Sequence, residues 1–218
     1  MFNKKNFIRL LISNQGISFF DTSAKGKYSG KPATVYFNWR TVLEDTYNLE
    51  KCAKYVIDYM CEKRINADCF VGVPEGATKL AVLLQYLWAK KSGMLKKSSD
   101  TSVIIRGKIK EHGVAKDREF LGVPKGDIIL IEDIIYRGGA IMDALNKLKK
   151  IDALPKAIIV LSDRTNPEYK NKINNYLLKH NIKFYAITSE KEVIKEAVTL
   201  LRPSDNIIRK LKSAGKLD

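Results

Sequence analysis

The stretch IILIEDIIYRGGA, residues 128–140, decides the fold of this chain. Four apolar residues run into Glu132 and Asp133, two glycines follow a few positions later, and an amphipathic segment begins there. This order predicts a buried strand, a tight turn and a helix. Backbone N–H groups at the start of such a helix suit a phosphate, while paired acids suit sugar hydroxyls or a divalent cation. Together these features fit a ribose 5-phosphate, but a plain turn whose acids cap a helix fits the same residues.

The succession of apolar strand, loop and amphipathic helix recurs along most of the chain. The expected strands are 69–73, 102–106, 128–131, 157–161 and 184–188, and the expected helices are 46–64, 77–90, 141–150, 171–180 and 190–201. Such a series is typical of an α/β fold with a central, mostly parallel sheet that helices cover on both faces.

This pattern divides the chain into three parts. Residues 1–45 predict an amphipathic helix and a small N-terminal hood subdomain made of aromatic, extended segments. Residues 46–201 form the expected α/β core, and residues 202–218 form a C-terminal helix or tail. Within the core, residues 106–122 are polar and charged, and a loop of this length is usually a functional lid or a disordered segment.

The charge balance and the cysteines narrow the environment and the partners. A net charge of +15 over 218 residues indicates nucleic acid, an acidic membrane surface or a phosphorylated substrate, unless lysine is simply the common surface residue. No helix-turn-helix pattern and no basic stripe studded with aromatics is evident, so nucleic acid is the less favoured partner. No apolar run reaches the roughly 18 residues of a membrane span. Cys52, Cys61 and Cys69 lack metal-ligand spacing, which predicts buried free thiols and a reducing cytoplasm.

The acid pair, the glycines and the small residue in 128–140 resemble the motif with which type I phosphoribosyltransferases bind 5-phosphoribosyl 1-diphosphate (PRPP). That family usually has threonines where Tyr136 and Arg137 stand. Four further segments, in the expected order, resemble orotate phosphoribosyltransferases. They are YSGKPATVYFN (28–38) of the base pocket, GVPEGATKLA (72–81) of the diphosphate loop, IRGKIKEHG (105–113) of the mobile catalytic loop, and LSDRT (161–165), whose Asp-Arg pair family members direct at the orotate carboxylate.

The resemblance implies a role for each matching residue. Glu132 and Asp133 would hold the ribose hydroxyls, with Asp133 near the reacting carbon. The catalytic residues implied are Lys110, His112 and Asp133. The residues implied for PRPP binding are Pro74, Glu75, Arg106, Lys108, Glu132, Asp133, Ile134, Ile135, Tyr136, Arg137, Gly138, Gly139 and Ala140. Those implied for orotate binding are Lys31, Tyr36, Phe37, Tyr136 and Arg164.

Simpler structural roles compete with some of these assignments, and two residues depart from the family pattern. Arg164 also fits a helix cap, and Tyr36 and Phe37 also fit core aromatics. Glu75 is an acid where many family members carry a basic or aromatic residue, and it would repel diphosphate unless magnesium intervenes. Tyr136 replaces a small hydroxyl residue, which leaves the base preference open.

The activity that the resemblance implies is transfer of ribose 5-phosphate from PRPP to orotate in pyrimidine biosynthesis, giving orotidine 5′-phosphate and diphosphate. Mg²⁺ would be held mainly through PRPP, without direct protein ligands. A homodimer whose catalytic loop acts in the neighbouring subunit, and a cytoplasmic location, follow from the same resemblance. Two alternatives are a phosphoribosyltransferase for another base and a non-catalytic PRPP sensor that regulates transcription.

Overall fold

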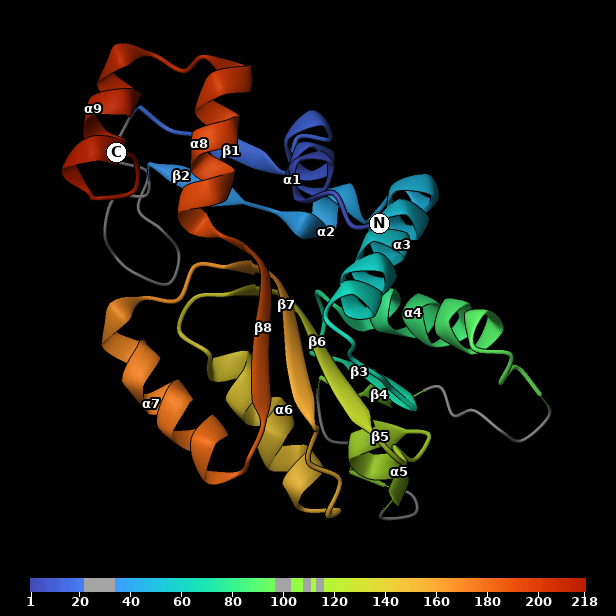
Figure 1. Cartoon of the computed structure of the whole chain (residues 1–218). Coiled ribbons are helices and arrows are strands. Elements are labelled where there is room, and N and C mark those ends of the chain that lie inside the picture. The colour runs from blue at the N-terminus through green and yellow to red at the C-terminus, as the bar shows by residue number, and fades with distance from the viewer. Residues whose placement is uncertain (22–33, 97–102, 108–110, 113–115) are drawn as a thin grey trace.

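The computed structural model describes residues 1–21, 34–96, 103–107, 111–112 and 116–218, and it is built around a six-stranded sheet (Figure 1). The strand order is β5-β4-β3-β6-β7-β8, and every neighbouring pair is parallel except β4 and β5. The bounds are β3 (Cys69–Gly72), β4 (Val103–Ile105), β5 (Phe120–Leu121), β6 (Ile128–Ile135), β7 (Ala157–Asp163) and β8 (Lys183–Ser189). The predicted α/β fold with a mostly parallel sheet is therefore confirmed.

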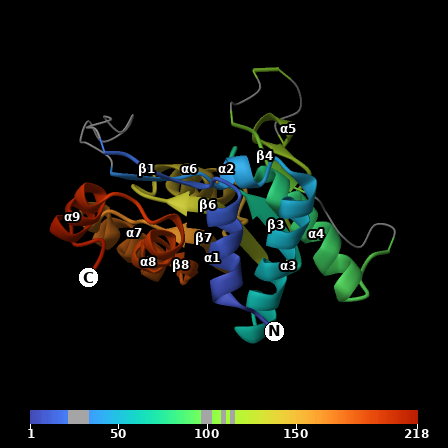
Figure 2. The same ribbon diagram turned by 90° about the horizontal axis from the view of Figure 1, so that it is seen from above.

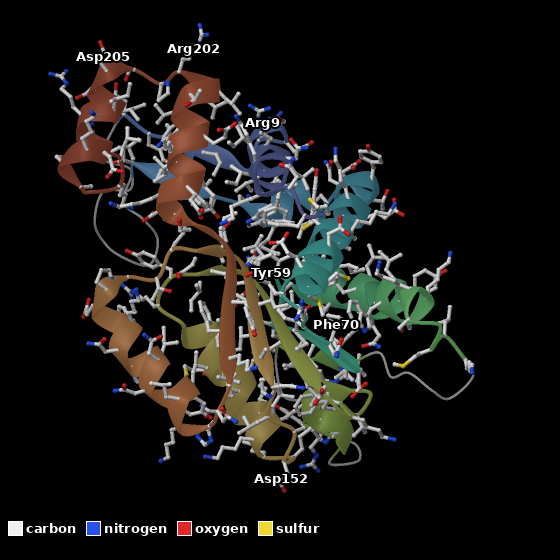
Figure 3. The ribbon with its side chains drawn as sticks, in the orientation of Figure 1. Arg9, Tyr59, Phe70, Asp152, Arg202 and Asp205 are labelled. Atoms are coloured by element: carbon white, nitrogen blue, oxygen red, sulfur yellow. The ribbon has the colours of Figure 1, made fainter. Side chains whose placement is uncertain are left out.

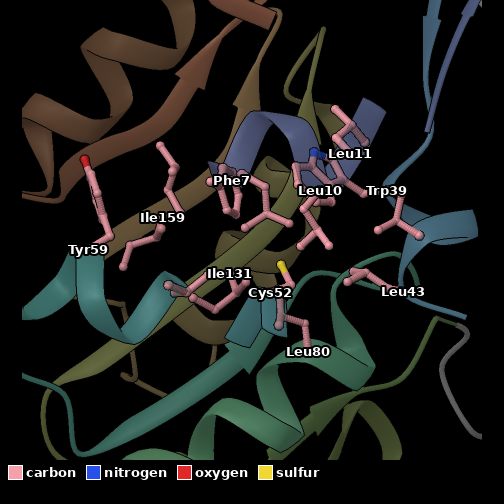
Figure 4. Close-up of a cluster of buried hydrophobic side chains, with 14 of the residues drawn as sticks. Phe7, Leu10, Leu11, Trp39, Leu43, Cys52, Tyr59, Leu80, Ile131 and Ile159 are labelled. Carbon is pink, nitrogen blue, oxygen red and sulfur yellow. The ribbon is translucent and has the colours of Figure 1, made fainter. Parts of the chain in front are cut away.

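The two faces of the sheet carry separate clusters of buried apolar side chains. Because side chains alternate along a strand, Ile129 and Ile131 of β6 join one cluster while Ile128 and Leu130 join the other. The first cluster contains side chains of the helices α1 (Lys4–Ser13), α3 (Thr46–Glu62), α4 (Thr78–Lys91) and α8 (Glu190–Leu201), and Figure 4 shows part of it. The second contains side chains of α6 (Gly139–Lys149) and α7 (Pro167–Lys179). The central strands are therefore apolar on both faces, as the uninterrupted run at 128–131 requires.

The N-terminal segment is fastened to this core by its aromatic side chains. The strands β1 (Ile17–Phe19) and β2 (Val35–Phe37) form a separate antiparallel sheet, and the short helix α2 (Trp39–Val42) follows. The indole of Trp39 is fully buried and its Nε1 donates to Ser162 Oγ of β7 at 2.9 Å. Helices α1 and α3 lie side by side (Figure 2), and the rings of Phe7 and Tyr55 meet between them at 5.8 Å.

The C-terminal residues after 201 form one more helix, α9 (Asp205–Ser213). Arg202 ends α8 in a left-handed conformation, and α9 starts at Asp205; Figure 3 labels both residues. Ile207 and Leu211 of α9 are buried in the first apolar cluster. The C-terminal helix is therefore part of the folded unit.

Three features differ from the sequence-based expectations. The strand expected at 128–131 runs on to Ile135, because Ile134 and Ile135 still pair with Ser162 and Asp163 of β7. The long loop expected at 106–122 contains the short helix α5 (Lys116–Glu119) and strand β5. Cys52 and Cys69 are buried free thiols as predicted, but Cys61 is exposed, so that prediction is wrong for one of the three. In the described part of the chain, no helix combines the length and apolarity needed to cross a bilayer.

Candidate active site at the carboxyl ends of the central strands

The strand order places a crevice at the carboxyl ends of β3 and β6. From β3 the sheet continues to β4 on one side and to β6 on the other, so the loops that leave β3 and β6 diverge. Ligands of open α/β sheets bind at such a reversal of strand order. The loops that follow β3, β6 and β7 carry the sequence-predicted residues Pro74, Glu75, Tyr136, Arg137 and Arg164 to this edge.

The two acids of β6 are almost completely withdrawn from solvent. Glu132 is 5% exposed and Asp133 is 6% exposed. Glu132 Oε1 accepts from the N–H of Asp133 at 3.0 Å, and Asp133 Oδ1 accepts from the N–H of Ile134 at 2.8 Å. Burial raises the pKa of Glu132 well above its ordinary value, and the neighbouring Asp133 raises it further. A buried carboxyl group whose pKa is raised in this way is typical of a functional site.

Arg40 of α2 is a site residue that the sequence patterns did not single out. Its Nε lies 3.7 Å from Asp133 Oδ2, although the two residues are far apart in the chain. The Arg40 side chain is mostly exposed, so this cation stands at the mouth of the site. The only sequence signal was its position at the end of the aromatic segment TVYFNWR, residues 34–40.

The loop after β3 presses against the same carboxylate. A Cβ added at Gly76 would lie 2.5 Å from Asp133 Oδ2, so only glycine fits there without a shift. The peptide bond between Pro74 and Glu75 is cis. Glu75 in turn approaches Gly107 after β4, because a Cβ on that glycine would lie 3.2 Å from Glu75 Oε1. The predicted diphosphate loop and the start of the predicted catalytic loop are therefore neighbours.

The turn after β6 has the geometry of an anion cradle. Gly138 precedes α6 with a φ of 75°, and a Cβ there would also meet Ile173 Cδ1 at 2.5 Å. Gly139 and Ala140, by contrast, are exposed, and no described atom lies within 4 Å of a Cβ added at Gly139. The first turn of α6 contains no acidic residue, and no side chain of the described residues caps it. Its leading N–H groups therefore remain available at the positive end of the helix.

Tyr136 and Arg137 lie in the turn between β6 and this cradle. The ring of Tyr136 is partly exposed, and its carbonyl oxygen accepts from the N–H of Asn166 at 2.9 Å. The Arg137 guanidinium lies 5.7 Å from the ring centroid of Tyr169 on α7. The Arg137 side chain is thus turned toward α7. Ile134 and Ile135 belong to the strand itself, so the turn proper starts at Tyr136.

Arg164 lies under the N-terminal sheet. Its Nε and Nη2 donate to Glu190 Oε1 at 2.9 and 2.7 Å, and its Cζ is 4.3 Å from the ring centroid of Phe37. Phe37 is only 2% exposed, so it supports the guanidinium from within the core. Tyr36, the other aromatic residue predicted for the base pocket, is 52% exposed.

The start of the predicted catalytic loop is fixed to α6. The backbone oxygen of Arg106 accepts from Lys147 Nζ at 2.7 Å, and the backbone N–H of Arg106 donates to the backbone oxygen of Glu119 at 2.8 Å. A cavity of about 610 Å³ lies between Ile105, Gly107, Pro74, Glu75 and α6. His112 is exposed. The predicted site residues Lys31, Lys108 and Lys110 lie outside the described residues.

Comparisons with known proteins were made on the sequence and on the fold. No family model matches the sequence. The chain is 28% identical over 198 residues to an orotate phosphoribosyltransferase of Pyrococcus horikoshii, covering 89% of this chain and 95% of that protein. An orotate phosphoribosyltransferase structure from Francisella tularensis superposes with a TM-score of 0.68 at 21% identity, over 95% of this chain and 93% of the other.

Two further matches bear on ligands and on regulation. The structure of the Mycobacterium tuberculosis orotate phosphoribosyltransferase in complex with PRPP superposes with a TM-score of 0.56 at 9% identity, over 89% of this chain and 90% of the other. A protein named transcriptional regulator GfcR from Methanococcoides burtonii is 21% identical over 164 residues, covering 73% of this chain and 78% of that protein.

The sheet order gives this chain the fold of the type I phosphoribosyltransferase class, and the buried acid pair and the open helix start match the PRPP-binding motif noted in the sequence. The resemblance seen in the motifs is thereby confirmed. Within that class, the sequence is similar over nearly its whole length to the orotate phosphoribosyltransferases.

Proposed function

We propose that this protein is an orotate phosphoribosyltransferase, which transfers ribose 5-phosphate from PRPP to orotate and releases diphosphate. The observation that carries the proposal is a single strand–turn–helix unit. It presents the buried acids Glu132 and Asp133 at one end of the turn and the open start of α6 at the other. An acid pair matches two ribose hydroxyls, and a free helix start matches the 5-phosphate.

In the proposed reaction, a ring nitrogen of orotate loses its proton to the departing diphosphate and forms a bond to the anomeric carbon of ribose. The bond from that carbon to the diphosphate oxygen breaks, and diphosphate leaves with the electron pair. Positive charge develops on the sugar, and Asp133 is proposed to face that charge. Among the described residues, the protein cation nearest to Asp133 is Arg40, at 3.7 Å. Arg106, Lys108, Lys110 and His112 are proposed to meet the negative charge on the leaving group.

Magnesium is proposed as the cofactor, bound mainly to oxygens of PRPP. Among the described residues, no group of three or more His, Cys, Asp or Glu side chains could hold a metal ion. Oxygens of PRPP are therefore proposed as the main ligands of Mg²⁺. When bound, the ion would neutralise diphosphate, which also relieves the repulsion from Glu75.

Orotate is the proposed acceptor because Arg164 is present at the edge of the site. A guanidinium pairs with a carboxylate through two parallel hydrogen bonds, and a purine base offers no carboxylate. Arg164 lies over the ring of Phe37 and donates to Glu190 through Nε and Nη2, so its orientation is set before any base arrives. Tyr36 is exposed on β2 and is the aromatic residue proposed for contact with the pyrimidine.

The proposal is tested by following the absorbance of orotate in a mixture of the protein, Mg²⁺, PRPP and orotate. Absorbance should fall as orotidine 5′-phosphate forms, and Arg164→Ala should raise the KM for orotate while the KM for PRPP stays nearly unchanged. PRPP binding without any loss of orotate at high protein concentration would contradict the proposed activity. A screen of other bases in the same assay would then identify the acceptor.

The proposed homodimer can be tested separately. If Lys110 acts in the neighbouring subunit, mixing inactive Lys110→Ala and Asp133→Asn variants should restore part of the activity. One site of each mixed dimer then contains both intact residues. Lack of recovery after subunit exchange, shown by mass spectrometry of the mixed dimer, would place the loop in its own subunit.

A second candidate function is a PRPP-sensing regulator of transcription. The similarity to the protein named transcriptional regulator GfcR and the net charge of +15 favour it. Binding to DNA that weakens steeply with salt and changes with PRPP, in a protein that leaves orotate unconsumed, would support this alternative.

A further inference from the structure

The guanidinium of Arg164 binds Glu190 along its Nε–Nη2 edge. It has five N–H donors. Two of them bind Glu190 Oε1, and a second donor of Nη2 reaches the backbone oxygen of Val35 at 3.4 Å. No described residue accepts from Nη1. The ring of Phe37 lies against one face at 4.3 Å, so the plane of the group is fixed while the Nη1 side stays available.

Glu190 is shared between two cations. Lys216 Nζ lies 3.0 Å from the same oxygen, Oε1, that holds Arg164. All three side chains are largely buried or half-buried, with 12% of Arg164, 21% of Glu190 and 31% of Lys216 exposed. Two positive charges around one negative charge leave the cluster with a net charge of +1. An Arg164–Glu190 pair alone would be neutral and would attract a substrate carboxylate less strongly.

Separate elements bring this cluster together, so it is a product of the fold. Glu190 is the first residue of α8, directly after β8, where the helix start favours a negative charge. Lys216 follows α9, whose Ile207 and Leu211 are buried in the core. Lys210 of α9 also binds Asp21 next to the N-terminal sheet. The C-terminal helix therefore delivers Lys216 to Glu190.

We propose that Glu190 and Lys216 are positioning residues for orotate specificity, and this inference rests on the proposed function. Glu190 orients Arg164 so that its Nη1 side meets the substrate carboxylate. Lys216 offsets the charge of Glu190, so that Arg164 keeps its attraction for that carboxylate. Neither residue touches the substrate, and both act through Arg164.

The test compares the KM for orotate with the KM for PRPP and with kcat in four variants. Lys216→Met should raise the KM for orotate about three- to tenfold, which is the range expected for a partly screened charge near an anion. Lys216→Arg should restore it. Glu190→Ala should also raise it, because Arg164 loses its anchor even though the local positive charge increases. In each case the KM for PRPP and kcat should stay near the wild-type values.

Lys191→Met is the matched control. The side chain of Lys191 also binds the C-terminal tail, through Asp218 at 3.5 Å, but it forms no ion pair with the Glu190 carboxylate. An equal rise in the KM for orotate in Lys191→Met and Lys216→Met would assign the effect to docking of the tail and overturn the inference. A lower KM in Glu190→Ala would make Glu190 an opposing charge and would also overturn it.

The wild-type assay separates this inference from the proposed function. If wild-type protein consumes orotate but Lys216→Met has an unchanged KM for it, only the inference fails. If wild-type protein instead uses a base without a carboxylate, the proposed function fails and the inference fails with it. Thermal unfolding of each variant, with and without PRPP, checks that the kinetic changes come from folded protein.

Discussion

The backbone of Gly76 lies against the carboxylate of Asp133, so closely that a Cβ on Gly76 would fall 2.5 Å from Asp133 Oδ2. The first residue belongs to the loop after β3 and the second to β6, and the two strands are neighbours in the sheet. This contact fixes the relative position of the predicted diphosphate loop and the predicted ribose-binding acid. A substitution at Gly76 therefore tests the geometry of the site without removing any functional group.

Gly76→Ala should lower kcat/KM by about 100-fold, because a displacement of about 1 Å at a reacting centre has effects of that size. Steady-state kinetics with PRPP and orotate measures the loss. In a double-mutant cycle, Gly76→Ala should add little to Asp133→Asn, since both changes act on one carboxylate. Fully additive effects would show that Gly76 acts elsewhere.

Gly139→Ala should have opposite effects on stability and on PRPP binding. Gly139 is the first residue of α6 and is not among the glycines with positive φ, so alanine should stabilise the fold by about 0.4–1 kcal/mol. The added methyl group enters the open space at the cradle and should raise the KM for PRPP. Chemical denaturation and kinetics measure the two effects.

Gly138→Ala is the contrasting variant for the same turn. Its φ of 75° and the contact with Ile173 both oppose a side chain, so this substitution should destabilise the fold. If Gly139→Ala binds PRPP as well as the wild type, the 5-phosphate does not occupy this helix start.

Glu132→Gln should make the fold more stable at neutral and alkaline pH. Burial and the neighbouring Asp133 raise the pKa of Glu132, so the folded state holds its proton more tightly than the unfolded state. The stability that this proton contributes is complete below the ordinary glutamate pKa of about 4.3 and is lost as pH rises toward the raised value. Glutamine removes the cost, so the melting temperature should rise by a few degrees at about pH 8 and be unchanged near pH 4.

Glu192→Gln provides the control of opposite sign. Partial burial acts to raise the pKa of Glu192, but hydrogen bonds from Ser189 and Lys4 lower it overall. Its contribution to stability is therefore present above the ordinary glutamate pKa and is lost as pH falls through the lowered value. This variant should be less stable than the wild type at neutral pH. If Glu132→Gln behaved in the same way, Glu132 would be a structural anion.

Lys147→Met should reduce kcat more than it reduces stability. Lys147 donates to the backbone oxygen of Arg106, at the start of the predicted catalytic loop, and its loss should let that start move. A decrease of about tenfold in kcat corresponds to the net contribution of one hydrogen bond from a charged group. Lys149→Met on the same helix is the control, because Lys149 is exposed and does not donate to the backbone oxygen of Arg106. Equal kinetics in the two variants would contradict the role given to Lys147.

The sequence predicted the features that depend on local periodicity and on glycine. The helix at 190–201 has the predicted bounds, and in the structure Ser189 and Glu192 form a capping box at its start. A turn between the strand at 128–131 and the helix at 141–150 was predicted from Gly138 and Gly139, and the structure has it between Ile135 and Gly139. The acid pair was also expected at the end of a strand, although β6 continues through it.

The contacts that complete the site could not be predicted, because they join residues far apart in the chain. Arg40 reaches Asp133, and Glu190 reaches Arg164, only through the packing of the N-terminal sheet and α8 on the core. Strand pairing with β7 also decided that β6 includes two acids, against their low preference for strands. Cys61 lies at the end of α3, where the helix face turns to solvent and periodicity is least informative.

The hydrogen bond between the Arg106 N–H and the Glu119 oxygen brings both ends of the intervening stretch to a single point on the sheet. The length of the stretch between Arg106 and Glu119 can therefore change without shifting either flanking strand. Doubling that length would add only about 0.6 kcal/mol to the free energy of closing the loop. Chimeras that exchange this stretch between distant relatives should accordingly fold. The stretch is therefore a suitable place to redesign turnover without changing the packing of the sheet and its helices.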